Sequence, residues 1–280
     1  MNILKVSIRS SVRRPVIIIL PAVLALVFFV INSYNPIMPV ILGISSATGG
    51  SFFEGVISAL QLIMDPAIIP GITVFMAGVV IFASLLAGII LSGYFHIIRN
   101  TLEGIKKTKS DFKAGIKKYF LKISIITLKA ALFIGLISCI MIVATVPAII
   151  ITRAATTTKP ELMLAAIFVD ILTAGVLFFG FMFSRVYLFY WYPAAIKNIK
   201  KPFRYAKRLV DRHFWRIVSR FVMFDIIFAI FIYLFMIIAS AVLKLLFGWI
   251  FTTVFATAMV IYIFQSFSEI VISNGQNDRS

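Results

Sequence analysis

The chain has 280 residues, of which 61% are hydrophobic and only 13% are charged. Soluble domains are usually about half apolar and a quarter charged, so this composition excludes an ordinary soluble protein and indicates a membrane protein. The formal net charge of +17 leaves two interpretations of the basic residues, which are binding to nucleic acid and contact with a membrane surface.

Apolar runs long enough to cross a hydrocarbon core of roughly 30 Å recur along the chain. We predict six transmembrane helices, with boundaries near 15–31, 68–90, 123–146, 164–183, 221–242 and 249–267. The expected fold class is therefore all-α, a polytopic membrane helical bundle in which the six helices form three hairpins. The hairpins make up a single integral membrane domain over 1–272, followed by a short polar tail at 273–280.

The basic residues are distributed unevenly among the connections between these spans. They gather before the first span, between the second and third, and between the fourth and fifth, whereas only Arg153, Lys159 and Lys244 lie in the other connections. Cytoplasmic loops of membrane proteins carry an excess of lysine and arginine. The pattern predicts a multi-pass protein of the cytoplasmic membrane with both termini in the cytoplasm.

An amphipathic helix is predicted before each odd-numbered span. At the amino terminus, apolar residues at positions 4, 8 and 12 lie beside basic ones. On the opposite side of the membrane, the loop 32–67 contains Ser51 and Glu54 in the spacing of a capping box, followed by apolar residues at helical spacing. This second pattern predicts a short interfacial helix, which either forms a lid over a pocket or covers the bundle.

The clearest amphipathic pattern lies at 202–221, which combines two stripes at helical spacing. The apolar stripe consists of Phe203, Ala206, Val210, Phe214, Ile217 and Phe221. The basic stripe consists of Arg204, Arg208, Arg212, Arg216 and Arg220. We predict a helix on the lipid surface, with aromatic side chains in the acyl boundary and arginines facing anionic headgroups.

The loop before the third span repeats this design. Arg99-Asn100 corresponds to Lys197-Asn198, and the segment at 119–123 aligns with that at 213–217. The repeat predicts headgroup contacts and interfacial anchors in both loops. The headgroup contacts are Arg204, Arg208, Arg212, Arg216, Lys113 and Lys117, and the anchors are Phe120, Phe214, Trp215 and Trp191. Because the aromatic residues belong to a stripe continuous with a membrane span, this pattern favours membrane lipid and excludes nucleic acid as the partner.

The stretch "YWYPAAIKNIKKPFRYAKRLVDRHFWRIVSRF" resembles a segment of the membrane domain attached to some bacterial glycerophosphoryl diester phosphodiesterases and of related bacterial multi-pass proteins. The resemblance covers about 35 residues well and implies architecture only, because no soluble segment could hold the phosphodiesterase domain. The amino terminus is similar, more weakly, to those of ABC-type exporter permeases. Against that second likeness, the long outer loop here follows the first span, whereas such permeases commonly carry theirs between the fifth and sixth.

The search for chemistry finds no catalytic, cofactor-binding or metal-binding motif. The remaining candidates are ionisable residues inside predicted spans, where a charge costs about 2.5 kcal/mol or more. Lys129 and Asp225 lie at similar depth in their predicted spans, so we expect them to form an intramembrane ion pair. This pair acts either as a proton or ion relay or as a structural clasp between the helices. Asp170 is a candidate polar site near the outer face, and Arg185 is a candidate partner of Asp225 or Glu269.

These features predict a non-enzymatic membrane protein, a scaffold or transport-accessory component that contacts anionic lipid through basic amphipathic helices. The alternative is a transporter proper, either the permease subunit of an ABC-type exporter or a small secondary carrier that uses Lys129 and Asp225. An ATPase or another membrane protein subunit is the expected partner in the permease case.

Overall fold

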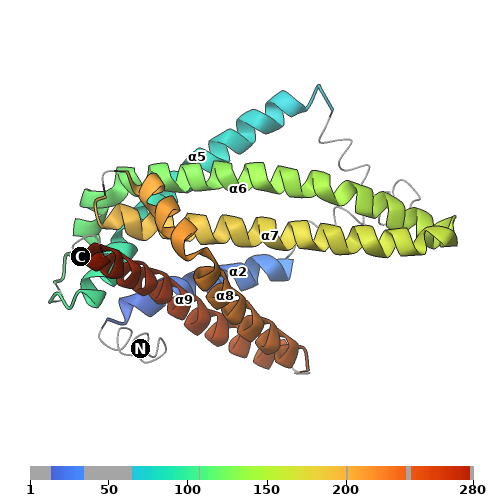
Figure 1. Ribbon diagram of the computed structural model, residues 1–280. Coiled ribbons are helices and arrows are strands. Elements are labelled where there is room, and N and C mark those ends of the chain that lie inside the picture. The colour runs from blue at the N-terminus through green and yellow to red at the C-terminus, as the bar shows by residue number, and fades with distance from the viewer. Residues whose placement is uncertain (1–13, 35–64, 107, 200, 238–240, 278–280) are drawn as a thin grey trace. The chain divides into compact units, whose positions relative to one another are not determined.

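The computed structural model describes residues 14–34, 65–106, 108–199, 201–237 and 241–277, and every regular element in these ranges is a helix (Figure 1). The elements are α2 (Val16–Tyr34), α5 (Ile69–Leu102), α6 (Asp111–Thr157), the 3-10 helix η1 (Pro160–Leu162), α7 (Met163–Ile196), α8 (Pro202–Ile237) and α9 (Ala241–Asn277). The amino-terminal amphipathic helix, the helix expected within 32–67 and the end of the tail lie outside the described residues.

Five of these helices, α5 to α9, are long and apolar enough to cross a membrane, whereas the apolar part of α2, Val16–Val30, is shorter. The all-helical fold and the membrane class are therefore confirmed. The sixth span, the hairpin arrangement and the orientation of the termini stay predictions from the sequence.

The helices contribute to two compact units, which we describe separately. Unit 1 contains Met1–Leu86 and Phe228–Val260, and unit 2 contains Ala87–Ile227 and Ile261–Ser280. The boundaries fall inside α5, α8 and α9, so these three helices belong to both units.

Within unit 1, the amino-terminal part of α9 packs on α2. The indole Nε1 of Trp249 donates a hydrogen bond of 2.8 Å to the carbonyl oxygen of Ala22. Gly248 lies against the ring of Phe29, where an added Cβ would come within 3.0 Å of the ring. On α8 and α9, the rings of Phe231 and Phe251 stack with a centroid distance of 4.0 Å. The short apolar helix α2 is therefore held against α9 by the Trp249 hydrogen bond and by the contact of Phe29 with Gly248.

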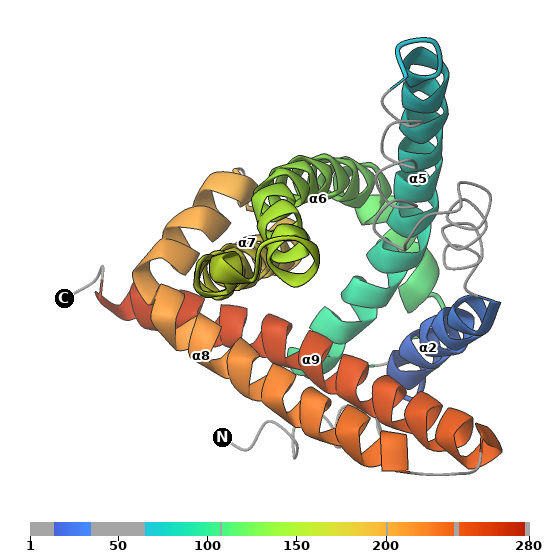
Figure 2. The same cartoon turned by 90° about the vertical axis from the view of Figure 1, so that its right-hand side faces the viewer.

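Unit 2 is built on the hairpin of α6 and α7, which lie side by side along their lengths with η1 at the turn (Figures 1 and 2). The carboxyl-terminal part of α5 approaches α6 closely, because a Cβ added at Gly115 would lie 2.6 Å from the Cβ of His96 and 2.8 Å from the carbonyl oxygen of Ser92. Small residues permit such close contact between helices in membranes.

Two basic residues, Arg99 of α5 and Lys122 of α6, bind the carboxyl-terminal end of α7. The guanidinium of Arg99 donates to the carbonyl oxygen of Ile196 at 3.2 Å, and the ammonium of Lys122 donates to that of Ala195 at 2.9 Å. The last carbonyls of a helix lack partners within it and carry partial negative charge, so cations stabilise this end. Part of the basic excess read from the sequence as a topology signal thus supports the fold.

The two aligned copies of the basic segment differ in the structure around their asparagines, Asn100 and Asn198. Asn198 has a positive φ of 56° and follows α7, where its N–H bonds to the carbonyl of Ala195, as in a helix end closed by a left-handed residue. Asn100 instead lies buried inside α5, and Gly104, with φ of 72°, closes that helix. The aligned asparagines therefore have different structural roles.

Helix α8 changes direction at His213, whose φ and ψ of −125° and 20° are not helical. Residues before His213 carry most of the arginine stripe, and residues after it continue into the apolar part. The kink at His213 therefore separates the arginine-rich beginning of α8 from its apolar continuation, whereas α6 runs from Asp111 to Thr157 as one helix.

Candidate functional site

The arginine stripe of α8 lies on the surface of unit 2. Arg204, Arg208, Arg212 and Arg216 are all exposed, as are Lys113 and Lys117 of α6. These are the side chains predicted to meet lipid headgroups, and their exposure leaves them available for that contact.

The apolar stripe of α8 does not face lipid as predicted, because it packs on protein. Ala206, Val210, Ile217 and Phe221 are at most 2% exposed. The ring of Phe221 lies 5.9 Å from that of Phe189 on α7 and 6.1 Å from that of Tyr262 on α9. Helical periodicity reveals which residues share a face, but it does not distinguish a face covered by lipid from one covered by other helices.

The predicted aromatic anchors have different surroundings. Trp215 is 71% exposed, in keeping with an interfacial side chain. Trp191 is half-buried, with its ring 4.8 Å from that of Phe203 and 6.0 Å from that of Phe133. Phe214 packs on Tyr187 and on Trp215, and Phe120 is also half-buried. Trp215 is therefore the anchor best placed to report on lipid.

Asp225 pairs with Arg185 and not with Lys129, which corrects the predicted ion pair. The Arg185 guanidinium donates to Oδ1 of Asp225, and Arg185 is the partner that the sequence offered as the second possibility. Lys129 is exposed, and its Nζ lies 4.7 Å from the ring centroid of Phe203. Lys129 lies nine residues after Phe120, and Asp225 lies eleven after Phe214. An α-helix turns about 100° per residue, so this difference of two residues matters. When Phe120 and Phe214 are superposed, the side chains of Lys129 and Asp225 point in directions about 200° apart.

Aromatic rings surround the Arg185 guanidinium. Its carbon lies 4.8 Å from the ring centroid of Phe221, 5.7 Å from that of Phe181 and 5.9 Å from that of Phe189. Cation–π attraction stabilises a charge in such a site when water is excluded. The second oxygen of Asp225, Oδ2, is buried without a hydrogen-bond partner among the described residues.

Asp170, the candidate polar site of α7, is exposed and accepts hydrogen bonds from the hydroxyl of Thr152 on α6, with both carboxylate oxygens 3.0 Å away. The contact joins the two helices of the hairpin near their connection. This geometry gives Asp170 a partner that was not among those considered from the sequence.

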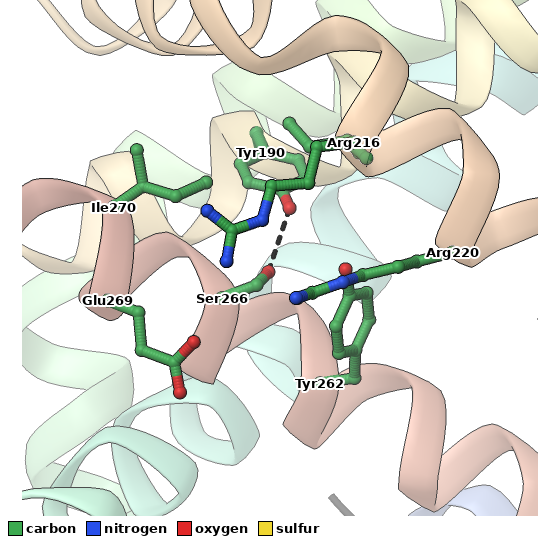
Figure 3. A pocket seen from close by; sticks show the side chains of 8 residues that line it. Tyr190, Arg216, Arg220, Tyr262, Ser266, Glu269 and Ile270 are labelled. Carbon is green, nitrogen blue, oxygen red and sulfur yellow. Dashed lines mark hydrogen bonds between the residues drawn. The ribbon is translucent and has the colours of Figure 1, made fainter. Parts of the chain in front are cut away.

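A polar cavity of about 190 Å³ lies among α7, α8 and α9 within unit 2 (Figure 3). It is lined by Tyr190, Arg216, Ile217, Arg220, Tyr262, Ser266, Glu269 and Ile270. Figure 3 shows the guanidinium groups of Arg216 and Arg220 beside the Tyr190 and Ser266 hydroxyls, with Glu269 on the neighbouring turn of α9. Five side chains that can donate hydrogen bonds therefore line one space: Tyr190, Arg216, Arg220, Tyr262 and Ser266.

The hydroxyl groups of the cavity have unequal bonding. Tyr190 and Ser266 are 2.8 Å apart, and Ser266 donates its proton to the carbonyl oxygen of Ile263 at 3.1 Å. A hydroxyl has one proton, so Tyr190 is the donor to Ser266. The hydroxyl of Tyr262 is buried and has no hydrogen bond of normal geometry among the described residues, although the Arg220 guanidinium carbon lies 5.8 Å from its ring centroid.

The sequence interpretation missed this cavity. Arg216 was predicted to contact lipid, and Tyr190 was not selected as a site residue. Of Tyr262, Ser266 and Glu269 on α9, only Glu269 was named, as a possible partner of Arg185. Those three residues recur at four and three positions along the last apolar helix. A polar stripe at that spacing on an otherwise apolar helix is the signal that indicates an inward-facing polar site.

Comparison of the chain with models of known families, with curated proteins and with solved structures gives no match. The resemblance to the phosphodiesterase-associated membrane domain therefore stays a prediction from the quoted residues. No three His, Cys, Asp or Glu side chains come together as a possible metal site within the described part of the chain.

Proposed function

We propose that the protein is a non-enzymatic multi-pass membrane protein, a scaffold or transport-accessory component, that contacts anionic lipid through the basic face of α8. The observation that carries this proposal is the division of α8 into a buried apolar stripe and an exposed arginine stripe. The helix is fixed to the bundle by its apolar side, which leaves its arginines free to meet a charged surface. We further propose that this surface is the cytoplasmic leaflet, because basic residues favour that side.

A fluorescence experiment on the full-length protein tests the lipid contact. Trp191 and Trp249 are replaced by Phe, so that the exposed Trp215 is the sole indole, and the protein is reconstituted with brominated phosphatidylglycerol or brominated phosphatidylcholine. We expect stronger quenching by the anionic lipid. Each basic residue near an anionic surface contributes roughly 1 kcal/mol, so changing Arg204, Arg208 and Arg212 to Gln should abolish the difference.

Lys244→Gln is the matched control, because Lys244 is exposed but lies far from the stripe in the sequence. Raising the salt concentration should weaken the preference in the parent protein and leave the triple variant unchanged. Equal quenching by the two lipids in the parent protein would overturn the proposal.

The Arg185–Asp225 pair supports a second candidate, a transporter. Ionisable groups inside membrane spans commonly belong to ion or proton pathways, and Oδ2 of Asp225 is buried without a hydrogen-bond partner among the described residues. A carrier would show substrate-dependent uptake in vesicles that is lost in Asp225→Asn. A permease subunit would co-purify with an ATPase from native membranes, and the absence of both results would favour the accessory role.

A further inference from the structure

We infer that the cavity between α7, α8 and α9 is a binding site for the phosphodiester group of a phospholipid, which Arg216 and Arg220 hold from one side. This inference rests on the proposed lipid-contacting function and assigns a site to it. The charge of the lining is the first argument. Two arginines and one glutamate leave a single excess positive charge, which matches the single negative charge of a phosphodiester.

The donors of the cavity also suit this group. Guanidinium groups bind phosphate oxygens through charge-assisted and often bidentate hydrogen bonds. Arg216 and Arg220 are four residues apart on α8, so they lie on the same face of the helix and can reach one anion together. Glu269 receives one hydrogen bond from Gln265, at 2.9 Å, and a carboxylate has further acceptor capacity. It is placed to accept from the hydroxyl or ammonium donors of a headgroup.

The buried hydroxyl of Tyr262 lies beside Arg220 and Tyr190 but makes no hydrogen bond of normal geometry with either, and a ligand would supply the well-formed bond that it lacks. Burying a hydroxyl without a hydrogen bond is unfavourable, and native structures contain few such groups. Tyr262 is 2% exposed, and the Arg220 side chain lies over its ring. When a phosphate draws the Arg220 guanidinium toward the cavity centre, the Tyr262 hydroxyl becomes accessible and donates to the ligand.

The size and position of the cavity favour a headgroup over a whole lipid. Its volume of about 190 Å³ lies below the roughly 300–1,000 Å³ of sites that enclose drug-sized ligands. Tyr190, Arg216 and Ser266 lie close to the ends of the apolar stretches 164–183, 221–242 and 249–267. The cavity therefore belongs at the level of the headgroups, with the acyl chains left in the surrounding bilayer.

Calorimetric titration of the full-length protein in detergent tests the inference. The ligands are short-chain phosphatidylglycerol, its soluble headgroup glycerophosphoglycerol, inorganic phosphate, and a diacylglycerol of the same chain length. We expect saturable binding of the first two and none of the diacylglycerol. Inorganic phosphate that binds as tightly as the phosphodiesters would overturn the lipid assignment and indicate a site for free phosphate.

The variants separate the cavity from the surface stripe. A hydrogen bond to a charged group contributes about 1.5–3 kcal/mol, so Arg220→Gln should weaken phosphatidylglycerol binding by roughly 10- to 100-fold. Tyr262→Phe should weaken it by about 2- to 10-fold with little change in the unfolding temperature, because its hydroxyl makes no hydrogen bond of normal geometry among the described residues. Arg208→Gln, on the same helix but outside the lining, should bind within about twofold of the parent.

The Tyr262→Phe result decides between a binding and a purely structural role, since only the former reduces affinity at unchanged stability. Parent-like binding in both Arg220→Gln and Tyr262→Phe would refute the site. The lipid-quenching experiment changes Trp191, Trp249 and Lys244 together with Arg204, Arg208 and Arg212, and none of these residues lines the cavity. The proposed function and the cavity assignment can therefore fail separately.

Discussion

Replacing Asp225 with Asn should destabilise the protein measurably, because it leaves the Arg185 guanidinium without its counter-charge. The side chain of Arg185 is 9% exposed and that of Asp225 is 34% exposed. Removing one partner of a buried ion pair typically costs about 3–5 kcal/mol. The three phenylalanine rings continue to stabilise the cation, and Asp225 is partly accessible, so we expect a loss of about 2–3 kcal/mol in the free energy of unfolding.

Equilibrium unfolding of the full-length protein in mixed detergent and dodecyl sulfate micelles measures this loss. The double variant Arg185→Met with Asp225→Asn should be more stable than the sum of the single changes predicts, by about 1–3 kcal/mol. Lys129→Met combined with Asp225→Asn should be additive within about 0.5 kcal/mol. Asp170→Asn, at an exposed carboxylate, is the control. Additivity for Arg185 and Asp225, or strong coupling of Lys129 to Asp225, would refute the pairing described here.

Two further predictions use the same unfolding assay. Gly115→Ala should cost about 1–3 kcal/mol because its Cβ would meet His96 and Ser92, whereas Gly135→Ala, in the same helix with open space around it, should be neutral or stabilising by up to about 1 kcal/mol. Equal effects at the two glycines would contradict the close approach of α5 to α6. Burial lowers the pKa of the Lys197 ammonium below its ordinary 10.5, so the charged form opposes folding at neutral pH. Lys197→Met should therefore raise the unfolding midpoint at pH 7, and this gain should shrink as the pH rises toward 10.5; a gain that grows with pH would show the opposite shift.

Helical periodicity predicted the burial pattern of α8 well, because side chains three and four positions apart share a face whatever covers it. Ala206, Val210, Ile217 and Phe221 were selected as one stripe and are buried together. This face is covered by protein. What covers it depends on how α7 and α9 pack against α8, and the spacing of apolar residues within α8 alone does not determine that packing. The same limit explains why the sequence pattern did not place Tyr190 in the cavity that it lines.

The partner of an ionisable residue depends on the direction of its side chain around the helix axis, which the sequence pattern does not supply. Asp225 was recognised as a charge within the apolar part of the chain, but Lys129 was expected as its partner. Arg185 meets it because α7 and α8 present those two residues to each other, and Phe181, Phe189 and Phe221 lie around the guanidinium. This arrangement forms only when α7 and α8 are packed together.

Helix α6 has 47 residues, and at a rise of about 1.5 Å per residue it measures roughly 70 Å, more than twice the hydrocarbon thickness of a bilayer. It carries Thr152 near one end, bonded to Asp170, and Gly115 near the other, pressed on α5. A rod of this length cannot lie wholly within lipid, so it projects beyond the membrane on at least one side. Because α6 is one continuous helix, a tilt would move its contact with Asp170 and its contact with α5 at the same time.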